Sequence, residues 1–165
     1  GGVRNVTVKN CTFADTENGL RIKSRRGKGG IVENISYSDI TMSNVNPAIT
    51  VTCSYANNSA GDTGKPVTEA DDATKDSAKI PTYRNIRVTN LTATCPKEAG
   101  DIVGLPESCI TDVVLKNVTI SAAKSFDVCN AKDVRLENVS VTVKKGEPFA
   151  LKNAEVEGLP APATH

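Results

Sequence analysis

The chain has 165 residues and almost balanced charge, with 20 Lys and Arg against 19 Asp and Glu, and 38% of its residues are hydrophobic. That is enough apolar material for one packed domain. A formal net charge of +1 provides no general attraction to nucleic acid or to an anionic membrane, and no run approaches the roughly 20 apolar residues of a membrane helix. We therefore expect no nucleic-acid partner and no membrane partner.

The composition favours β-structure. Val, Ile and Thr together account for 45 residues, whereas Leu accounts for only 7. β-branched side chains lose rotamer freedom in a helix but pack well on a pleated sheet. With 3 Phe, 3 Tyr and no Trp, the chain also has few aromatic residues for a flat stacking surface. These counts predict an all-β protein.

One short pattern occurs five times along the chain. In order, it contains Asn or Asp, an apolar residue, any residue, a mostly apolar residue, any residue, Asn or Asp, an apolar residue, and Thr or Ser. Its copies occupy residues 3–12, 32–41, 83–92, 110–119 and 131–140. The second Asn or Asp falls at 10, 39, 90, 117 and 138, so the steps are 29, 51, 27 and 21 residues. The long step contains a polar insert of about residues 56–80.

Without that insert, every step lies between 20 and 30 residues, a period typical of solenoids in which successive coils stack as parallel strands. The pattern predicts a right-handed parallel β-helix, with Asn or Asp at the bends because Asn tolerates left-handed backbone. We expect one domain over residues 1–158 and a disordered tail over 159–165. The chain starts directly in a strand at Val3 with no segment to cap it, which suggests that N-terminal coils are missing.

Further strands are expected at residues 19–24, 48–53 and 149–152. In the first, alternation directs Leu20 and Ile22 inward and therefore sends Arg21 and Lys23 outward together. Five cations fall within residues 21–28, in and after this strand. Arg can bind a carboxylate through two hydrogen bonds and Lys adds a point charge, so the pair is a candidate carboxylate receiver. The alternative is an ordinary solvated outer face.

The segment Gly19-Leu20-Arg21-Ile22-Lys23-Ser24, continuing through residues 27–35 and 39–45, resembles the Arg-Ile-Lys region of the polygalacturonase family, the pectin-degrading glycoside hydrolases of family 28. Residues 102–108 and 110–113 resemble a segment found further along in bacterial-type members. The resemblance implies a right-handed parallel β-helix, and the repeat indicates the same fold independently.

The resemblance also implies a substrate-binding site. In that family the Arg and Lys of the triplet contact galacturonate carboxylates, and a Tyr about one coil later lines the same subsite. The matching positions are Arg21, Lys23 and Tyr55. The family's catalytic carboxylates and its Gly-His-Gly motif lie on coils before the triplet, and no matching motif occurs in this chain, so we expect no catalytic residue here.

Other acidic residues are poor substitutes for the missing catalytic pair. Asp71 and Asp72 lie in the polar insert, without apolar neighbours that could raise a pKa or fix their geometry, and we interpret them as part of a solvated loop. Glu107, next to Pro106, is expected to pair with a turn or a basic neighbour. The single His, His165, lies in the terminal tail.

The five cysteines show neither a Cys-x-x-Cys motif nor a Cys/His metal spacing, so no metal and no cofactor is expected. Cys11 aligns with core positions of the other coils. Cys109 and Cys129 occupy nearly equivalent places on adjacent coils, which stack about 4.8 Å apart, and they are candidates for a disulfide. The local Cys95–Cys109 pairing remains the alternative.

The sequence therefore predicts the C-terminal portion of a polygalacturonase-like hydrolase that acts on galacturonan, with this segment supplying carboxylate binding. By the same resemblance we expect a secreted or periplasmic protein, a pectic oligosaccharide as partner, and a monomer when full length. A non-catalytic β-solenoid that binds carbohydrate or acts in adhesion is the alternative. A pectate-lyase-type β-helix would need clustered acidic residues on one strand face to hold Ca²⁺, and none is apparent outside the insert.

Overall fold

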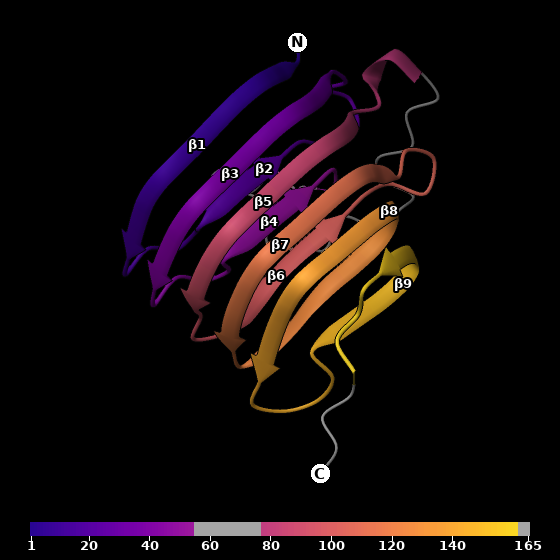
Figure 1. The fold of residues 1–165 in the computed structure, drawn as a ribbon. Coiled ribbons are helices and arrows are strands. Elements are labelled where there is room, and N and C mark those ends of the chain that lie inside the picture. The colour runs from indigo at the N-terminus through magenta and orange to yellow at the C-terminus, as the bar shows by residue number, and fades with distance from the viewer. Residues whose placement is uncertain (55–76, 162–165) are drawn as a thin grey trace, which may run out of the picture.

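The computed structural model describes residues 1–54 and 77–161, which form nine strands and one short 3-10 turn (Figure 1). The elements in chain order are β1 (Val3–Ala14), β2 (Leu20–Lys23), β3 (Ile31–Ser43), β4 (Ile49–Thr52), the 3-10 turn η1 (Ser77–Lys79), β5 (Thr82–Thr94), β6 (Glu98–Val103), β7 (Ile110–Ala122), β8 (Lys124–Val143) and β9 (Phe149–Glu157).

All pairings between these strands are parallel, and they form one continuous sheet in the order β1-β3-β5-β7-β8-β6-β4-β2, with β9 added on β8. The sheet closes on itself through β8, whose first residues pair with β6 and whose later residues pair with β7. Figure 1 shows the resulting curl, with β1, β3, β5 and β7 on one side and β2, β4 and β6 behind them. This is the architecture of a right-handed parallel β-helix, so the predicted fold class is confirmed.

The repeated Asn and Asp residues mark the bends between faces of the solenoid. Within the long strands they adopt left-handed backbone, with φ between 51° and 58°. One set of bends comprises Asn5, Asn34, Asn85, Asp112 and Asp133, and the other comprises Asn10, Asp39, Asn90, Asn117 and Asn138. Because Asn and Asp tolerate this conformation better than other residues with a Cβ, the fold itself selects the pattern seen in the sequence.

The second set of bends is also joined by side-chain hydrogen bonds between coils. Asn90 Nδ2 donates to Asp39 Oδ1 at 2.9 Å, and Asn117 Nδ2 donates to Asn90 Oδ1 at 3.1 Å. Asn138 extends the ladder by donating to Asn117 at 2.9 Å. Each amide thus satisfies its neighbour and holds the coils in register.

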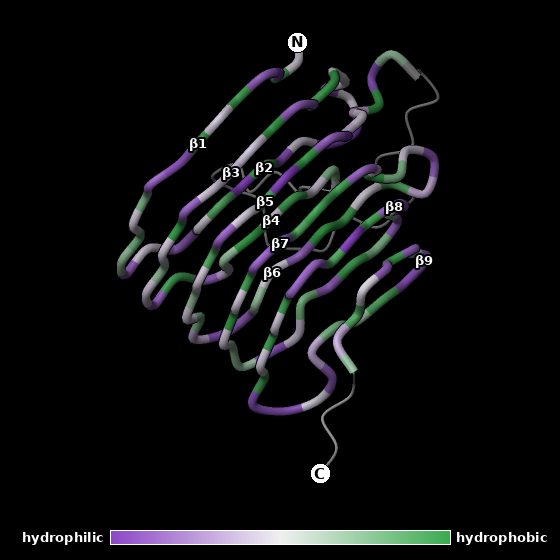
Figure 2. The backbone as a smooth tube through the Cα atoms, viewed as in Figure 1, coloured by the Kyte–Doolittle hydropathy of each residue, from purple (hydrophilic) through white to green (hydrophobic). Residues whose placement is uncertain are grey.

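The core is built from apolar residues stacked in register on successive coils. One stack comprises Ile40, Leu91, Val118 and Val139, all buried, and Cys11 extends it as a half-buried residue, as expected. A second comprises Leu20, Ile49, Gly100, Phe126 and Phe149. Figure 2 shows the accompanying alternation of apolar and polar residues along the strands.

Gly100 is needed in this second stack because of close packing by its neighbours. A Cβ at this position would lie 2.5 Å from the Ile49 carbonyl oxygen and 2.6 Å from the Phe126 ring. Its absence lets the Phe126 side chain fill the core directly beneath β6. The following residue of β6, Asp101, consequently points to the outer face.

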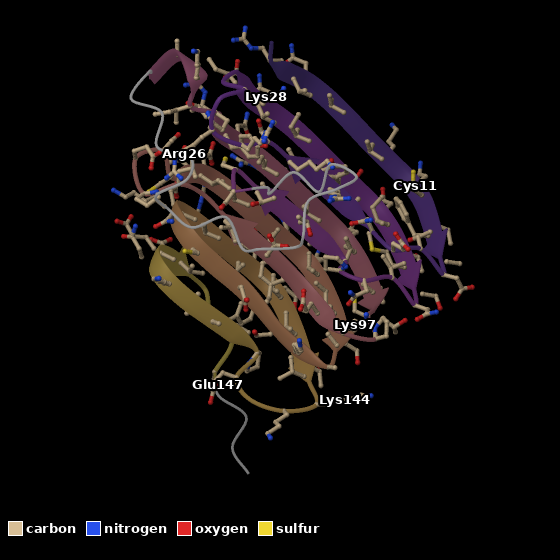
Figure 3. All side chains as sticks on the ribbon, turned by 180° about the vertical axis from the view of Figure 1, so that it is seen from behind. Cys11, Arg26, Lys28, Lys97, Lys144 and Glu147 are labelled. Carbon is tan, nitrogen blue, oxygen red and sulfur yellow. The ribbon has the colours of Figure 1, made fainter. Side chains whose placement is uncertain are left out.

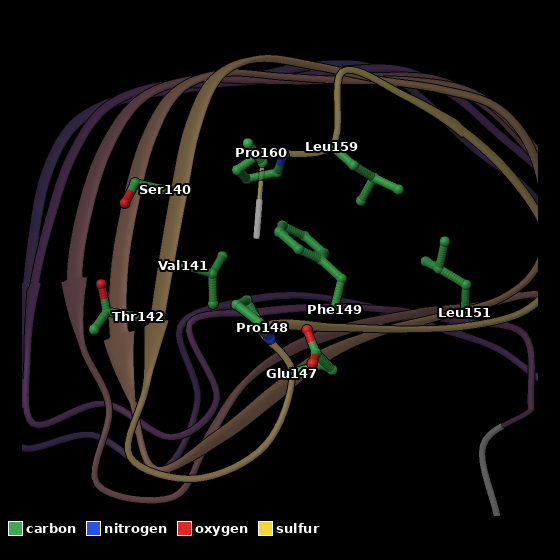
Figure 4. A pocket seen from close by; sticks show the side chains of 10 residues that line it. Ser140, Val141, Thr142, Glu147, Pro148, Phe149, Leu151, Leu159 and Pro160 are labelled. Atoms are coloured by element: carbon green, nitrogen blue, oxygen red, sulfur yellow. The ribbon is translucent and has the colours of Figure 1, made fainter. Parts of the chain in front are cut away.

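The two ends of the described solenoid differ. β1 and β2 are the edge strands of the sheet. At the other end a pocket of about 340 Å³ lies between the last coil and residues 159–161, and Phe149, Leu159 and Pro160 lie around it in Figure 4.

Across residues 1–54 and 77–161 the structure has no helix with the length and apolarity needed to span a membrane.

Candidate functional site

The candidate site lies on the outer face of the short strands β2, β4, β6 and the first part of β8, which we call the short-strand face. Arg21 and Lys23 are both exposed on β2, whereas Leu20, the first residue of that strand, is only 4% exposed. Ile22 is half-buried rather than buried, because β2 is an edge strand and its core side is covered by one neighbouring coil only. Strand alternation therefore brings the two cations to one face.

Beside β2 the structure has a hollow of about 280 Å³ at the end of the solenoid formed by β1 and β2. Its lining includes Arg21 and Lys23, but its other members are mostly apolar: Val3, Val6, Ile22, Val32, Ile35 and Tyr37. Burial raises the pKa of the Tyr37 hydroxyl, which keeps this group neutral. The hollow therefore adds apolar contact area next to the two cations rather than further charge.

The glycine-rich turn after β2 is held by other coils. The N–H groups of Gly27 and Gly29 donate to the Lys79 carbonyl oxygen at 2.9 and 3.0 Å. Arg26 forms a two-point ion pair with Glu107, with an Nη2 to Oε2 distance of 2.9 Å, and its side chain is only 14% exposed. Figure 3 shows Arg26 and Lys28 at the same end of the molecule. Arg26 is thus a structural cation rather than a member of a solvated cluster.

This ion pair agrees with the expectation that Glu107 binds a basic neighbour. The hydrogen bonds from Arg26 hold the pKa of the Glu107 carboxyl below its usual range. Because Arg26 and Glu107 lie 81 residues apart in the sequence, the pair connects the turn after β2 with the turn after β6. It fixes the two loops that border one end of the short-strand face.

A row of aligned outer residues crosses the short-strand face from coil to coil. The strand register places Arg21 next to Thr50, Thr50 next to Asp101, and Asp101 next to Asp127. The Thr50 hydroxyl donates to Asp101 Oδ1 at 2.9 Å, and the Ser125 hydroxyl donates to Asp127 Oδ1 at 2.6 Å. The row therefore begins with a cation on β2 and ends with carboxylates on β6 and β8.

Asp101 has an unusual electrostatic environment. Burial raises the pKa of its carboxyl, the hydrogen bond from Thr50 opposes that shift, and the negative charges of Glu98 and Asp127 reinforce it. Arg21 lowers the same pKa through its charge. Arg21 therefore lies within electrostatic reach of Asp101, although it is two strands away in the register.

A buried tyrosine supports the end of this face. Tyr83 is fully buried, and its hydroxyl donates to the Thr52 carbonyl oxygen at 3.1 Å. Burial raises the pKa of this hydroxyl, and a hydrogen bond with Ser24 opposes the shift. Tyr83 therefore anchors the chain where β2 and β4 end.

Several residues singled out in the sequence are not covered by the structure. Tyr55, Asp71, Asp72 and His165 lie outside the described residues, so Tyr55 remains an expectation from the family resemblance. Of the three expected substrate-binding residues, the structure brings Arg21 and Lys23 together.

All five cysteines lie within the described residues and are free thiols in this structure. Cys129 is aligned with Val103 on β6, whereas Cys109 precedes Ile110, which is aligned with Ala131. Cys109 and Cys129 are therefore offset by one position in the register of neighbouring coils. A Cys109–Cys129 disulfide remains a prediction. Cys53 is a separate case: burial raises the pKa of its thiol to about 12, which keeps that thiol protonated.

The repeat pattern overlooked two strands of the short-strand face, β6 and the first part of β8, and with them Asp101 and Asp127. The pattern of alternation in residues 98–103 was a usable signal: Ile102 is buried and its neighbours Asp101 and Val103 face outward. Asp101 and Asp127 lie side by side on adjacent strands. In the described part of the chain they do not form part of a group of three metal-ligating side chains.

Comparisons with known proteins identify the family of this chain. The family model described as "Glycosyl hydrolases family 28" matches residues 1–142. The chain is 32% identical over 130 residues to a "Probable endopolygalacturonase I" of Aspergillus flavus, covering 77% of this chain and 32% of that protein. It is 27% identical over 146 residues to an "Endo-polygalacturonase" of Pectobacterium carotovorum, covering 87% of this chain and 29% of that protein.

A "Polygalacturonase" of Prunus persica is 45% identical over 65 residues, covering 39% of this chain and 16% of that protein. No solved structure matches the chain. Because the family model covers most of the sequence, the chain belongs to glycosyl hydrolase family 28. It spans about a third of the length of the polygalacturonases that it matches over most of its own length.

Proposed function

We propose that this chain forms the carboxylate-binding part of a polygalacturonase that hydrolyses α-1,4-galacturonosyl bonds in galacturonan. The observation that carries the proposal is the joint outward placement of Arg21 and Lys23 on β2, in a chain of this family. The relatives named as polygalacturonases supply the substrate class. A secreted or periplasmic location, a monomeric whole protein and the absence of any cofactor are parts of the same proposal.

The chemistry of the two cations fits uronate recognition. A guanidinium can hold both oxygens of a carboxylate, while the neighbouring ammonium adds a flexible point charge. Arg21 and Lys23 are separated by two residues of a strand, roughly 6.6 Å along it. This spacing allows them to share one carboxylate or to bind two groups of the same sugar chain. By the family resemblance, Tyr55 is the third residue of the proposed subsite.

In this proposal the role of residues 1–165 is binding, and the general acid and base are supplied elsewhere. Glycoside hydrolysis requires one protonated and one ionised carboxyl at a defined separation across the scissile bond. The family resemblance assigns the catalytic carboxylates to coils before Arg21, whereas Asp101 and Asp127 lie on later coils and match none of the family's catalytic motifs. A non-catalytic carbohydrate-binding solenoid is the second candidate function, and the chain's own surface serves it equally well.

Titration calorimetry with a galacturonate hexamer tests the binding role. We expect weak binding that decreases as salt rises from about 50 to 300 mM, because ions screen the attraction between exposed charges. Arg21→Ala and Lys23→Ala should each weaken binding about tenfold, since a hydrogen bond to a charged group is worth about 1.5 kcal/mol or more. Lys132→Ala removes an exposed charge from β8 beyond the short-strand face and is the matched control.

Equal losses from all three substitutions would indicate a general charge effect and would contradict the proposed site. Undiminished binding by the Arg21→Ala, Lys23→Ala double variant would contradict it as well.

A further inference from the structure

The charge along the short-strand face is positive on β2 and negative on β6 and β8. Arg21 and Lys23 lie on β2, Thr50 follows on β4, and Asp101 and Asp127 occupy β6 and β8. With strands about 4.8 Å apart, Asp101 lies roughly 10 Å and Asp127 roughly 14 Å from the Arg21 position along the row. An oligosaccharide of a few units laid across the strands would meet both parts.

We propose that Asp101 and Asp127 exclude a uronate carboxylate from the β6 and β8 end of this row, so that the face selects a sugar chain with a free carboxylate over β2 and an uncharged unit over β6 and β8. The inference rests on the proposed function of Arg21 and Lys23. The uncharged unit is a galacturonate whose carboxyl is methyl-esterified, or a neutral sugar in its place.

Geometry supports this assignment of Asp101. Thr50 donates its hydroxyl hydrogen to Asp101 Oδ1, which fixes the carboxylate in the row. The next residue of β6, Ile102, is fully buried in the core, which fixes the strand. Asp101 is half-buried, so its charge is less screened by water than that of an exposed carboxylate. A uronate carboxylate placed next to Asp101 would be repelled, because β6 carries no cation to compensate.

Charged groups on three strands act on Asp101. Arg21 on β2 attracts it, whereas Glu98 on β6 and Asp127 on β8 repel it. Glu98 is itself paired with Lys124 at 3.5 Å, so that cation is directed to Glu98. Among the charged groups that the structure describes around Asp101, the carboxylates lie on β6 and on the adjacent β8, whereas Arg21 lies two strands away, so an incoming carboxylate meets repulsion there.

The same carboxyl gives the selection a pH dependence. Burial raises the pKa of Asp101 above its ordinary value, so it becomes neutral as pH falls before a solvated uronate carboxylate does. Discrimination against a free carboxylate over β6 should therefore be greatest near pH 7 and should weaken as pH falls through the pKa of Asp101.

The test compares three probes on the 165-residue chain: a galacturonate hexamer, the same hexamer with about half of its carboxyls methyl-esterified, and an oligomer in which galacturonate alternates with a neutral sugar. The second and third probes distinguish the two sources of an uncharged unit. We expect at least one of them to bind about tenfold more tightly than the first at pH 7.

Asp101→Asn keeps an oxygen that accepts the Thr50 hydrogen bond but removes the charge, so the fold should persist. The Asp101→Asn, Asp127→Asn double variant should bind the fully ionised hexamer about tenfold more tightly than the unsubstituted chain does, and should lose its preference between probes. In Asp101→Asn alone, the change of preference as pH falls from 7 should disappear. Glu137→Gln, an exposed change in the second half of β8, is the matched control for net charge.

An equal or higher affinity of the unsubstituted chain for the fully ionised hexamer, with no gain in the double variant, would overturn the inference and leave the role of Arg21 and Lys23 intact. Failure of all three probes to bind would overturn both proposals together. A gain in Glu137→Gln as large as that in Asp101→Asn would show a general charge effect and would also overturn the inference.

Discussion

At the scale of single residues, position on the strand decides which cation can meet a ligand. Arg21 and Arg26 are five residues apart, yet Arg21 is exposed on β2 while Arg26 is nearly buried in its pair with Glu107. A count of positive charges over residues 21–28 treats the two alike. The structure separates a candidate binding group from a cation that joins two loops.

This difference predicts distinct phenotypes for the two arginines. Arg21→Ala should weaken binding of a galacturonate oligomer about tenfold and change the free energy of unfolding little. Arg26→Ala should lower the free energy of unfolding by about 1 kcal/mol, because it leaves Glu107 without its partner. Calorimetric binding and urea denaturation measure the two effects. Equal loss of binding in the two variants at matched folded fraction would contradict the assignment.

Glu107→Gln provides a second residue-scale prediction, with a defined pH dependence. The Arg26 guanidinium lowers the pKa of Glu107 in the folded chain, so this ion pair stabilises the fold at neutral pH and is lost as pH falls through the lowered pKa. Near pH 7 the variant should be about 0.5 to 1 kcal/mol less stable than the unsubstituted chain, as expected for a partly exposed pair. At pH 3 or below the difference should shrink towards zero, as judged by urea titrations at each pH.

At the scale of elements, the asparagine ladders explain both the bends and the repeat. Asn90 combines left-handed backbone at φ 56° with a hydrogen bond to Asp39 and another from Asn117. The same ladder positions create most of the Asn-x-Ser/Thr sequences in this chain. Their recurrence therefore reflects the geometry of the solenoid.

Substitution of Asn90 should separate these two contributions. Asn90→Ala loses both hydrogen bonds and places a residue of low left-handed tolerance at the bend, with an expected cost of about 2 to 3 kcal/mol. Asn90→Gly loses the same hydrogen bonds but accepts the backbone conformation, so it should cost about 1 kcal/mol less than Asn90→Ala. Denaturant unfolding of both variants measures the difference. A glycine variant less stable than the alanine variant would contradict this explanation.

The element scale also shows what the sequence could and could not predict. The long strands were predictable because Asn or Asp recurs at both ends of an alternating segment, and the register of Cys11 with Ile40 followed from it. β6 and the start of β8 lack these markers. Their pairing depends on contacts between coils, such as the space that Gly100 leaves for Phe126, and these become apparent only when the coils are stacked.

The candidate site was accessible from the sequence to a similar extent. Alternation in β2 predicts that Arg21 and Lys23 share a face, since this depends on one strand alone. The approach of Arg26 to Glu107 across 81 residues depends on how the loops fold together, and so does the row that joins Arg21 to Asp101. These relations require the three-dimensional register.

At the scale of the whole molecule, the division between binding and chemistry predicts that the 165-residue chain releases no reducing sugar from polygalacturonate. The family resemblance supplies no general acid or base within it, because its catalytic motifs lie on coils before Arg21. A reducing-sugar assay on pure protein, over hours and at pH 4 to 7, measures this directly. Release that is abolished by Asp71→Asn, Asp72→Asn, Asp101→Asn or Asp127→Asn would contradict the prediction.

The most direct measurement of the central claim is a crystal structure of this chain with a bound galacturonate oligomer. We expect a uronate carboxylate within about 3 Å of the Arg21 guanidinium, and an oxygen of the same sugar chain near the Lys23 ammonium. An oligomer bound in the pocket beside Phe149 and Pro160 instead, with the short-strand face unoccupied, would contradict the assignment of the substrate-binding site.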